Sequence, residues 1–269
     1  MAWYSTLMNS DMYKSESGSG LKPKIVTWAD GTDEEIAAML EAHYNNDINV
    51  QYYWSVGDER VVHLSAITAE GENAMEAQPE QDIILVLLNQ GGKELVTPIN
   101  GHTECAFVVG QKDCLLSSGK LFTSNSTTGW PSSPRKAWCN SKYKDALPLS
   151  LVSIFKQYKD WFCNQYSDTS ASSLSSDYFR LPTLREITGN SYTYDKAAGY
   201  YTQLKYYTTS SNIQKKIGDT ESNYWTSTKY YTTSSTASQQ RRMMYINTDY
   251  SSSYAVSTSS YGIAPQGVI

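Results

Sequence analysis

The sequence predicts an α+β fold, with mixed or antiparallel sheets and two or three packed helices. An amphipathic helix pattern begins after Thr32, and two further helical segments lie near the middle of the chain. Between them, four strand patterns follow one another at 60–68, 82–89, 94–99 and 105–110. With 269 residues, 40 % of them hydrophobic, the chain is long enough to bury a large core.

The chain divides into a leader and one domain. Residues 1–22 are polar and lack periodicity, so we expect either a flexible leader that attaches the domain to another structure or an ordinary frayed terminus. Residues 23–269 form the domain. The first residues lack the basic start and apolar stretch of a signal peptide, which predicts a protein made in the cytoplasm. No run of about 18 apolar residues occurs, so no membrane insertion is expected.

The first helix has clear sequence signals. Thr32 and Glu35 match a capping box, in which each side chain bonds the backbone of the other residue. Apolar positions then recur at helical spacing, at Ile36, Met39 and Leu40, followed by His43. We expect His43 to lie at the edge of the core. Neither His63 nor His102 is expected to pair with it, so the histidines predict no metal or acid-base site.

The strand region and the middle of the chain give more detailed expectations. The segment 82–89 is almost continuously apolar, which predicts a strand buried on both faces. Gly91-Gly92 predicts a hairpin that joins this strand to the next one. Helices are expected at 135–147 and at 150–161, the second with one apolar face made of Leu151, Ile154, Phe155 and Tyr158. A Ser-rich loop at 168–176 and a short strand should follow, and Pro182 should occupy the first turn of a short helix.

Composition excludes several classes of function. A net charge of −5, with only 18 % charged residues, offers no basic face for nucleic acid. The cysteines show no zinc-binding spacing and are expected to be reduced and buried, although four cysteines allow disulfide pairings that sequence cannot rank: Cys105, Cys114, Cys139 and Cys163. Three tryptophans suggest either a sugar-stacking set or, more commonly, core packing: Trp130, Trp138 and Trp161. No metal and no cofactor are expected.

The segment 223–260 has an unusual composition. Of its 38 residues, 23 are Ser, Thr or Tyr, and none is Gly or Pro. Tyr supplies rigid contact area and small hydroxyl residues supply adaptable hydrogen bonds, as in antibody paratopes. The alternative is a disordered polar tail, but apolar residues interrupt the segment, at Trp225, Met243, Met244, Ile246 and Val256. We therefore interpret it as a recognition surface on a folded scaffold.

Alternation within this segment assigns the candidate ligand contacts. Met244, Ile246 and Thr248 should face the core, while the residues between them face outward. Ten residues are expected to contact a ligand: Thr226, Thr228, Tyr230, Tyr231, Arg241, Tyr245, Asn247, Asp249, Tyr250 and Tyr254. Arg241 and its neighbour Arg242 are expected either to add charge-assisted bonds to an acidic or carbonyl-bearing partner or to lie in a solvated loop.

Three motifs resemble those of a known fold. The segment Phe179-Arg180-Leu181-Pro182-Thr183-Leu184-Arg185-Glu186 is similar to the RLPT-x-x-E segment of the formylglycine-generating-enzyme branch of the C-type lectin fold. Tyr224-Trp225-Thr226-Ser227 resembles its W-(S/T)-S strand, and Tyr261-Gly262-Ile263-Ala264-Pro265 resembles its closing strand. The segments 27–32, 105–110 and 138–156 also resemble an uncharacterised family of gut-phage and prophage proteins with this fold, and the similarity spans roughly residues 25–269.

This resemblance implies a binding protein rather than an enzyme. Several such proteins are variable targets of diversity-generating retroelements, which substitute codons that began as Asn and so yield Tyr, Ser, Thr and Asp. The implied function is recognition of a protein or glycan receptor on a bacterial surface by a virion-associated phage protein. No Cys follows Cys163, which argues against formylglycine-generating activity, and the calcium-binding motifs of sugar lectins are missing. The alternatives are a phage-tail or surface subunit that uses 223–260 for homo-oligomeric assembly, and a degenerate enzyme.

Overall fold

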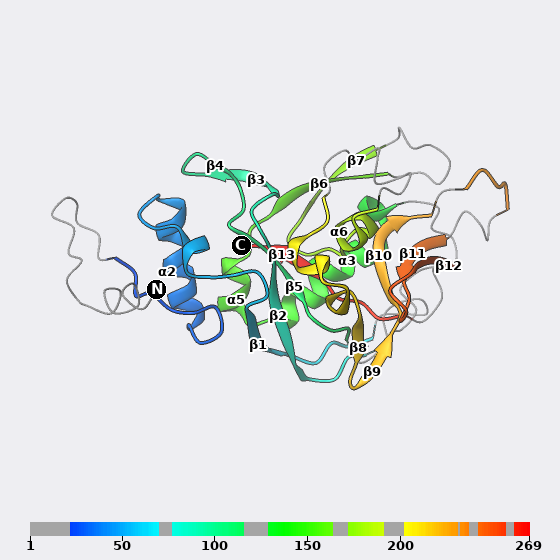
Figure 1. Ribbon diagram of the computed structural model, residues 1–269, viewed down its shortest axis with the longest axis horizontal. Helices are drawn as coiled ribbons and strands as arrows, with labels where there is room; N and C mark the ends of the chain where they lie inside the picture. Colours follow the sequence, from blue (N-terminus) through cyan, green and yellow to red (C-terminus); the bar gives the residue numbers. More distant parts are fainter. Residues whose placement is uncertain are drawn as a thin grey trace.

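The computed structural model describes residues 22–69, 77–115, 129–163, 172–190, 202–230, 232–236, 242–256 and 261–269. Short helices and antiparallel sheets make up this part of the chain, which confirms the α+β class. Helix α2 (Asp33–Tyr44) lies at one end of the molecule, and strands β10 (Tyr224–Lys229), β11 (Arg242–Ile246) and β12 (Ser252–Val256) lie at the other (Figure 1). None of the described helices has the length and apolar character that a bilayer crossing requires.

The central sheet contains β1 (Glu59–Leu64), β2 (Gln81–Gln90), β5 (Phe107–Gln111) and β13 (Gln266–Val268), in that order. Strand β2 is buried continuously from Leu85 to Leu88, as predicted for a strand covered on both faces. Strand β13 pairs with β5, with Gln266 opposite Gly110. It also forms single bridges to Lys156 and Arg180. The end of the chain therefore connects the central sheet to the middle segments.

A second sheet has the order β4 (His102–Glu104), β3 (Glu94–Ile99), β6 (Tyr158–Cys163) and β7 (Ser172–Asp177). The predicted hairpin at Gly91-Gly92 is wrong, because β2 and β3 belong to different sheets. Both glycines have a left-handed backbone, with φ of 59° and 87°, and they turn the chain out of one sheet into the next. The short strand β4 was not predicted.

Helix α2 confirms the first helical prediction. The Thr32 hydroxyl accepts a hydrogen bond from the Glu35 amide at 3.3 Å, and the Glu35 carboxylate accepts one from the Thr32 amide at 3.0 Å. The apolar face is buried against α5 (Leu149–Ile154). His43 is half-buried at the edge of the core, as expected, but its ring lies 5.4 Å from that of His102. The sequence pattern did not reveal this contact, which arises because the β3–β4 turn folds back onto the end of α2.

The middle of the chain departs from its helical periodicity. The predicted helix 135–147 is divided into α3 (Pro134–Trp138), a π-helical turn (Cys139–Tyr143) and α4 (Lys144–Ala146). Helix α5 ends at Ile154, and the rest of the predicted helix 150–161 runs into β6. Strand pairing overrides the helical pattern there: Lys156 pairs with Val268. The apolar residues assigned to that helical face are nevertheless buried.

The segment after β6 also differs from expectation. Ser172–Asp177 forms strand β7 on β6 instead of a Ser-rich loop, because an antiparallel partner satisfies its backbone. Helix α6 (Leu184–Thr188) starts later than predicted. Thr183 caps it in a second capping box with Glu186, so Pro182 lies before the cap and not in the first turn.

The remaining elements are short. They are β8 (Lys215–Ile217) and β9 (Thr220–Ser222), which form a hairpin, and the 3₁₀ turns η1 (Val50–Tyr52), η2 (Trp130–Ser132), η4 (Lys205–Thr208) and η5 (Ser210–Asn212). Trp130 and Trp138 are buried, as expected for core residues rather than a sugar-stacking set. The side chain of Trp161 lies outside the described part.

Three cysteines are free thiols in the core, which confirms the expectation for Cys105, Cys114 and Cys139. The side chain of Cys163 is outside the described part. Burial raises the pKa of Cys105 and of Cys114 to about 12, and it also raises the pKa of Cys139. Lys215 behaves in the opposite way, since burial lowers its pKa to about 8.

These shifts predict a loss of stability at alkaline pH. Above about pH 9 the thiols ionise in the unfolded chain but stay protonated in the folded protein, so their contribution is complete below pH 9 and decreases towards pH 12. Lys215 has the opposite effect on stability and offsets the contribution of about one thiol. Its ammonium group holds its proton more tightly in the unfolded chain than in the folded protein. We expect the free energy of unfolding to fall by about 2–3 kcal/mol from pH 9 to pH 10. Urea titrations under reducing conditions will measure this, and a flat profile would contradict it.

Candidate recognition surface

Trp225 is the buried base of the candidate surface. Its ring is fully buried in β10, and its centroid lies 4.9 Å from that of Tyr261 and 6.0 Å from that of Tyr245. The guanidinium of Arg135 lies 4.2 Å from the Trp225 centroid, in cation–π geometry. The backbone amide of Trp225 donates to Gly262 at 2.9 Å. The closing segment and helix α3 thus hold this ring in place.

Two predicted contact residues are buried, and their assignment to the surface is wrong. Thr226 and Thr228 are 0 % and 3 % exposed, because β10 is covered on both faces. The Thr226 hydroxyl donates to the carbonyl of Met244 at 2.9 Å. The Thr228 hydroxyl accepts from the amide of Leu184, also at 2.9 Å, and so helps to satisfy the first turn of α6. Hydroxyl side chains enter the core here because backbone groups satisfy them.

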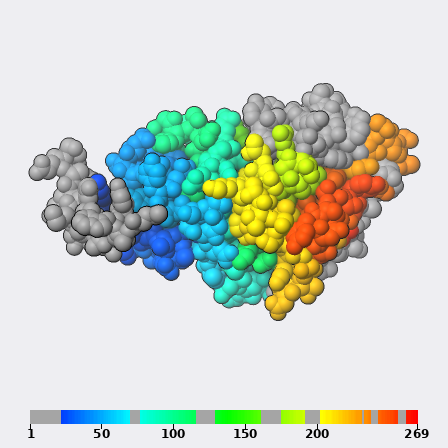
Figure 2. Space-filling model, in the orientation of Figure 1, coloured from blue at the N-terminus to red at the C-terminus, as the bar shows by residue number. Residues whose placement is uncertain are grey.

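The outward residues form an aromatic cluster at the end of the molecule. The rings of Tyr230 and Tyr254 stack with centroids 4.0 Å apart, and Arg242 lies 4.8 Å from the Tyr254 ring. Tyr254 is 42 % exposed. Figure 2 shows β11 and β12, in orange and red, on the outside of this end of the molecule. Aromatic rings held by a cation and by each other lose little freedom when a ligand binds.

Tyr245 is partly buried and partly exposed. Its ring is half-buried and stacks on Tyr261 with a centroid distance of 4.3 Å. The expected alternation holds for its neighbours, since Met244 and Ile246 are buried. It fails at Thr248, which was expected to face the core but is exposed in the turn after β11, where strand geometry has ended.

The β11–β12 turn presents polar groups that bond one another. Asn247 donates to the Ser251 hydroxyl at 2.8 Å, and Ser251 donates to the Asp249 carboxylate at 2.6 Å. These bonds from Ser251 lower the pKa of Asp249. Tyr250 is 40 % exposed and adopts a left-handed backbone with φ of 67°, and its hydroxyl donates to Gln214 at 3.2 Å. Such a backbone costs about 1–3 kcal/mol for a residue other than glycine.

Seven residues at this end of the molecule are at least partly exposed, and together we call them the recognition surface: Tyr230, Arg242, Tyr245, Asn247, Asp249, Tyr250 and Tyr254. Tyr245 lies on the Trp225 face of the sheet, whereas Tyr254 is opposite Met244 and lies on the other face. Arg242 was expected either to add charge-assisted bonds or to lie in a solvated loop, and it starts strand β11 instead. Tyr231 and Arg241 lie outside the described residues.

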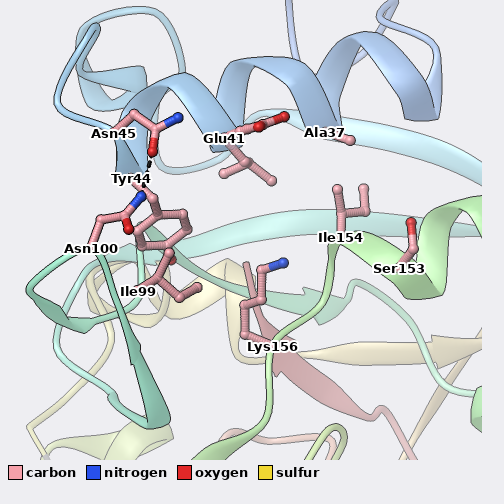
Figure 3. A pocket seen from close by; sticks show the side chains of 10 residues that line it. Ala37, Glu41, Tyr44, Asn45, Ile99, Asn100, Ser153, Ile154 and Lys156 are labelled. Carbon is pink, nitrogen blue, oxygen red and sulfur yellow. Dashed lines mark hydrogen bonds between the residues drawn. The ribbon is translucent and has the colours of Figure 1, made fainter.

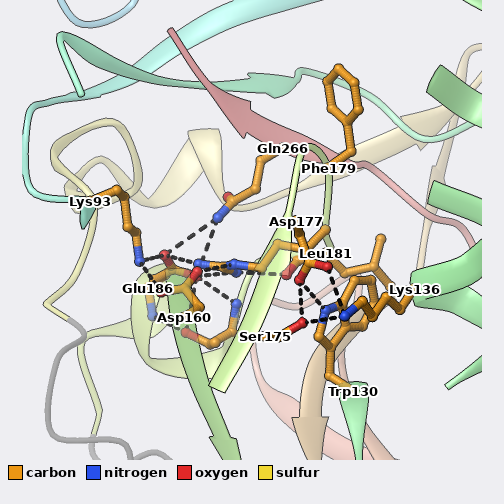
Figure 4. A network of polar contacts seen from close by, with 12 residues as sticks. Lys93, Trp130, Lys136, Asp160, Ser175, Asp177, Phe179, Leu181, Glu186 and Gln266 are labelled. Carbon is orange, nitrogen blue, oxygen red and sulfur yellow. Dashed lines mark hydrogen bonds and ion pairs between the residues drawn. The ribbon is translucent and has the colours of Figure 1, made fainter. Parts of the chain in front are cut away.

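A buried ion cluster, which was not predicted, supports this surface (Figure 4). The Arg180 guanidinium binds both oxygens of Glu186, at 2.6 and 2.8 Å, and also contacts Asp160. Lys93 binds Glu186 at 2.6 Å and Asp160 at 3.4 Å. Burial by itself raises the pKa of Glu186, but Arg180 and Lys93 hold it well below its usual range. Two cations thus neutralise two carboxylates inside the core.

The ion cluster fixes helix α6 next to β10. Glu186 also closes the capping box, because it accepts from the amide of Thr183 at 2.8 Å. The carbonyl of Pro182 accepts from the amide of Ser227 at 2.9 Å. Arg180 and Glu186 both belong to the RLPT-x-x-E motif in the sequence. That motif alone does not indicate that the two side chains form an ion pair.

The chemistry of the surface is that of contact and hydrogen bonding. The surface carries tyrosine rings, the Arg242 guanidinium, the Asn247 amide, the Asp249 carboxylate and hydroxyl groups. Among the described residues, no three His, Cys, Asp or Glu side chains gather as a metal site. Comparisons of the chain with protein-family models, with curated proteins and with solved structures find no match.

Proposed function

We propose that this is a non-enzymatic binding protein that displays a variable Tyr/Ser/Thr-rich surface on a C-type lectin scaffold. Its ligand is a protein or glycan receptor on a bacterial surface, and its setting is a phage or prophage particle. The observation that carries the proposal is the division within 223–260. Trp225 and Ile246 are buried scaffold residues, whereas Tyr250 and Tyr254 are large aromatic side chains that project outward.

Physical chemistry favours recognition by this surface. Exposed tyrosines supply most of the binding energy in many interfaces, because a rigid ring buries a large area and its hydroxyl still finds a hydrogen bond. The strand residues between them, Met244 and Ile246, are buried, so substitutions on the surface need not disturb the core. Diversification by a retroelement would exploit this separation.

Binding of the labelled protein to a panel of bacterial strains tests the function. We expect the double variant Tyr230→Ser/Tyr254→Ser to weaken binding about 100-fold, since it removes a stacked aromatic pair. The matched control is Tyr52→Ser, because Tyr52 is 84 % exposed in η1. This turn contacts α2, which lies at the opposite end of the molecule (Figure 1). Binding that survives in the double variant, or is lost equally in the control, would contradict the proposal.

Two further measurements separate the alternatives. Light scattering over a range of concentrations reports self-association. If the double variant dissociates an oligomer that the control keeps, the surface serves assembly, as in a structural tail subunit. Diversification itself requires a near-copy of the 3′ end of the gene that differs at adenines, beside a reverse transcriptase gene.

A further inference from the structure

A pocket of about 390 Å³ lies at the end of the molecule opposite the recognition surface. Helices α2 and α5 and the β3–β4 turn line it, and one side is open to solvent (Figure 3). Leu40, Ile99 and Ile154 supply apolar walls. Its volume falls within the range of small-molecule sites, about 300–1,000 Å³. The recognition surface does not account for this pocket.

Lys156 gives the pocket a positive charge. Its backbone amide donates to the carbonyl of Val268 at 2.9 Å, which fixes the residue beside β13. Its side chain points into the pocket (Figure 3). Half-burial lowers the pKa of this ammonium. In the part of the chain that the structure describes, no carboxylate lies within ion-pair distance of it, so an incoming acid would meet an available cation.

Hydrogen bonds within the protein hold the polar residues at one end of the pocket. The Asn100 amide donates to the Asn45 side chain, and Asn100 holds a left-handed backbone with φ of 47°. The Tyr44 hydroxyl accepts from the amide of Ala106 at 3.1 Å, and its ring packs edge-on against His102 at 5.5 Å. These contacts fix the wall without a ligand, which lowers the entropy cost of binding.

Glu41 limits what the pocket can accept. Its exposed carboxylate lines the same pocket as Lys156, so one negative charge on a ligand is compensated and a second is repelled. We propose that this pocket binds a small monocarboxylate with an apolar body. The carboxylate pairs with the Lys156 ammonium, and the carbon chain lies against Leu40 and Ile154.

Ligand-observed NMR and calorimetry on the full chain test this site, with 4-methylpentanoate as the first probe and straight-chain and phenyl monocarboxylates as a panel. We expect saturable binding at millimolar concentration or below, and about tenfold or more weaker binding in Lys156→Gln, because the charged hydrogen bond is lost. Glu41→Gln should bind as well or better. The matched control is Lys216→Gln, which removes the same charge from an exposed site on β8.

The neutral and cationic analogues decide between charge recognition and simple apolar binding. If 4-methylpentanamide or isopentylamine binds as tightly as the acid, or if Lys156→Gln binds as the unmodified protein does, the proposal is overturned. Failure of the whole acid panel to bind also overturns it. Circular dichroism of each variant confirms that its fold is intact. None of these outcomes depends on whether the recognition surface binds a receptor.

Discussion

Replacing Arg180 with methionine is expected to lower the free energy of unfolding by about 3–5 kcal/mol. The substitution leaves Glu186 and Asp160 buried with Lys93 as their one remaining cation within the ion cluster. Glu186 is 0 % exposed, so solvent cannot replace the lost partner. Urea denaturation at neutral pH measures the change.

The neighbouring strand positions provide a matched control. Lys159 pairs with Glu94 at 3.0 Å on the exposed side of β6 and β3, one residue away from the buried partners Asp160 and Lys93. Removing an exposed ion pair costs about 0–1 kcal/mol. Lys159→Met should therefore leave stability almost unchanged. Equal effects of the two substitutions would show that the buried ion cluster contributes no more than a surface pair.

Replacing Trp225 with alanine is expected to cost about 3–5 kcal/mol of stability. The side chain is fully buried, and its removal opens a cavity between Arg135, Tyr245 and Tyr261. Tyr245 and Tyr261 then lose the ring against which they pack, so receptor binding should fall together with stability. Thermal unfolding and urea titration measure the first effect, and the strain-binding assay measures the second.

The contrast with Tyr254 tests the division between scaffold and replaceable residues. Trp225→Phe should recover part of the stability, because an aromatic ring remains beneath Tyr261. Tyr254→Ala should change the free energy of unfolding by less than about 1 kcal/mol, since its ring is 42 % exposed. A loss in Tyr254→Ala as large as that in Trp225→Ala would mean that Tyr254 belongs to the core.

Local signals in the sequence predicted local structure well. The capping box at Thr32 and Glu35 located the start of α2, and the apolar run 82–89 located the buried strand β2. Both depend on interactions within a few residues. The predicted alternation in β11 held in part: Met244 and Ile246 are buried, but Met243, on the same face as Tyr245, is buried too.

Errors occurred where distant segments decide the structure. Lys156 pairs with Val268, so a helical pattern gives way to strand pairing. Thr226 and Thr228 have the composition of surface residues, but backbone groups of β11 and α6 make their burial favourable. The buried ion cluster and the Lys156 pocket each join residues from three or more segments, and no short-range pattern specifies such meetings.

Strand β13 has a consequence for the rate of folding. It pairs with β5 and bridges two middle segments, so the central sheet is incomplete until the chain around the recognition surface has been brought back to it. Such pairings between distant residues slow folding, because the entropy of closing a long loop is lost before contacts are gained. That entropy grows only by about 0.6 kcal/mol for each doubling of loop length. Variants that differ in sequence or length within 223–260 should therefore fold at similar rates, provided that Trp225 and the closing strand are kept.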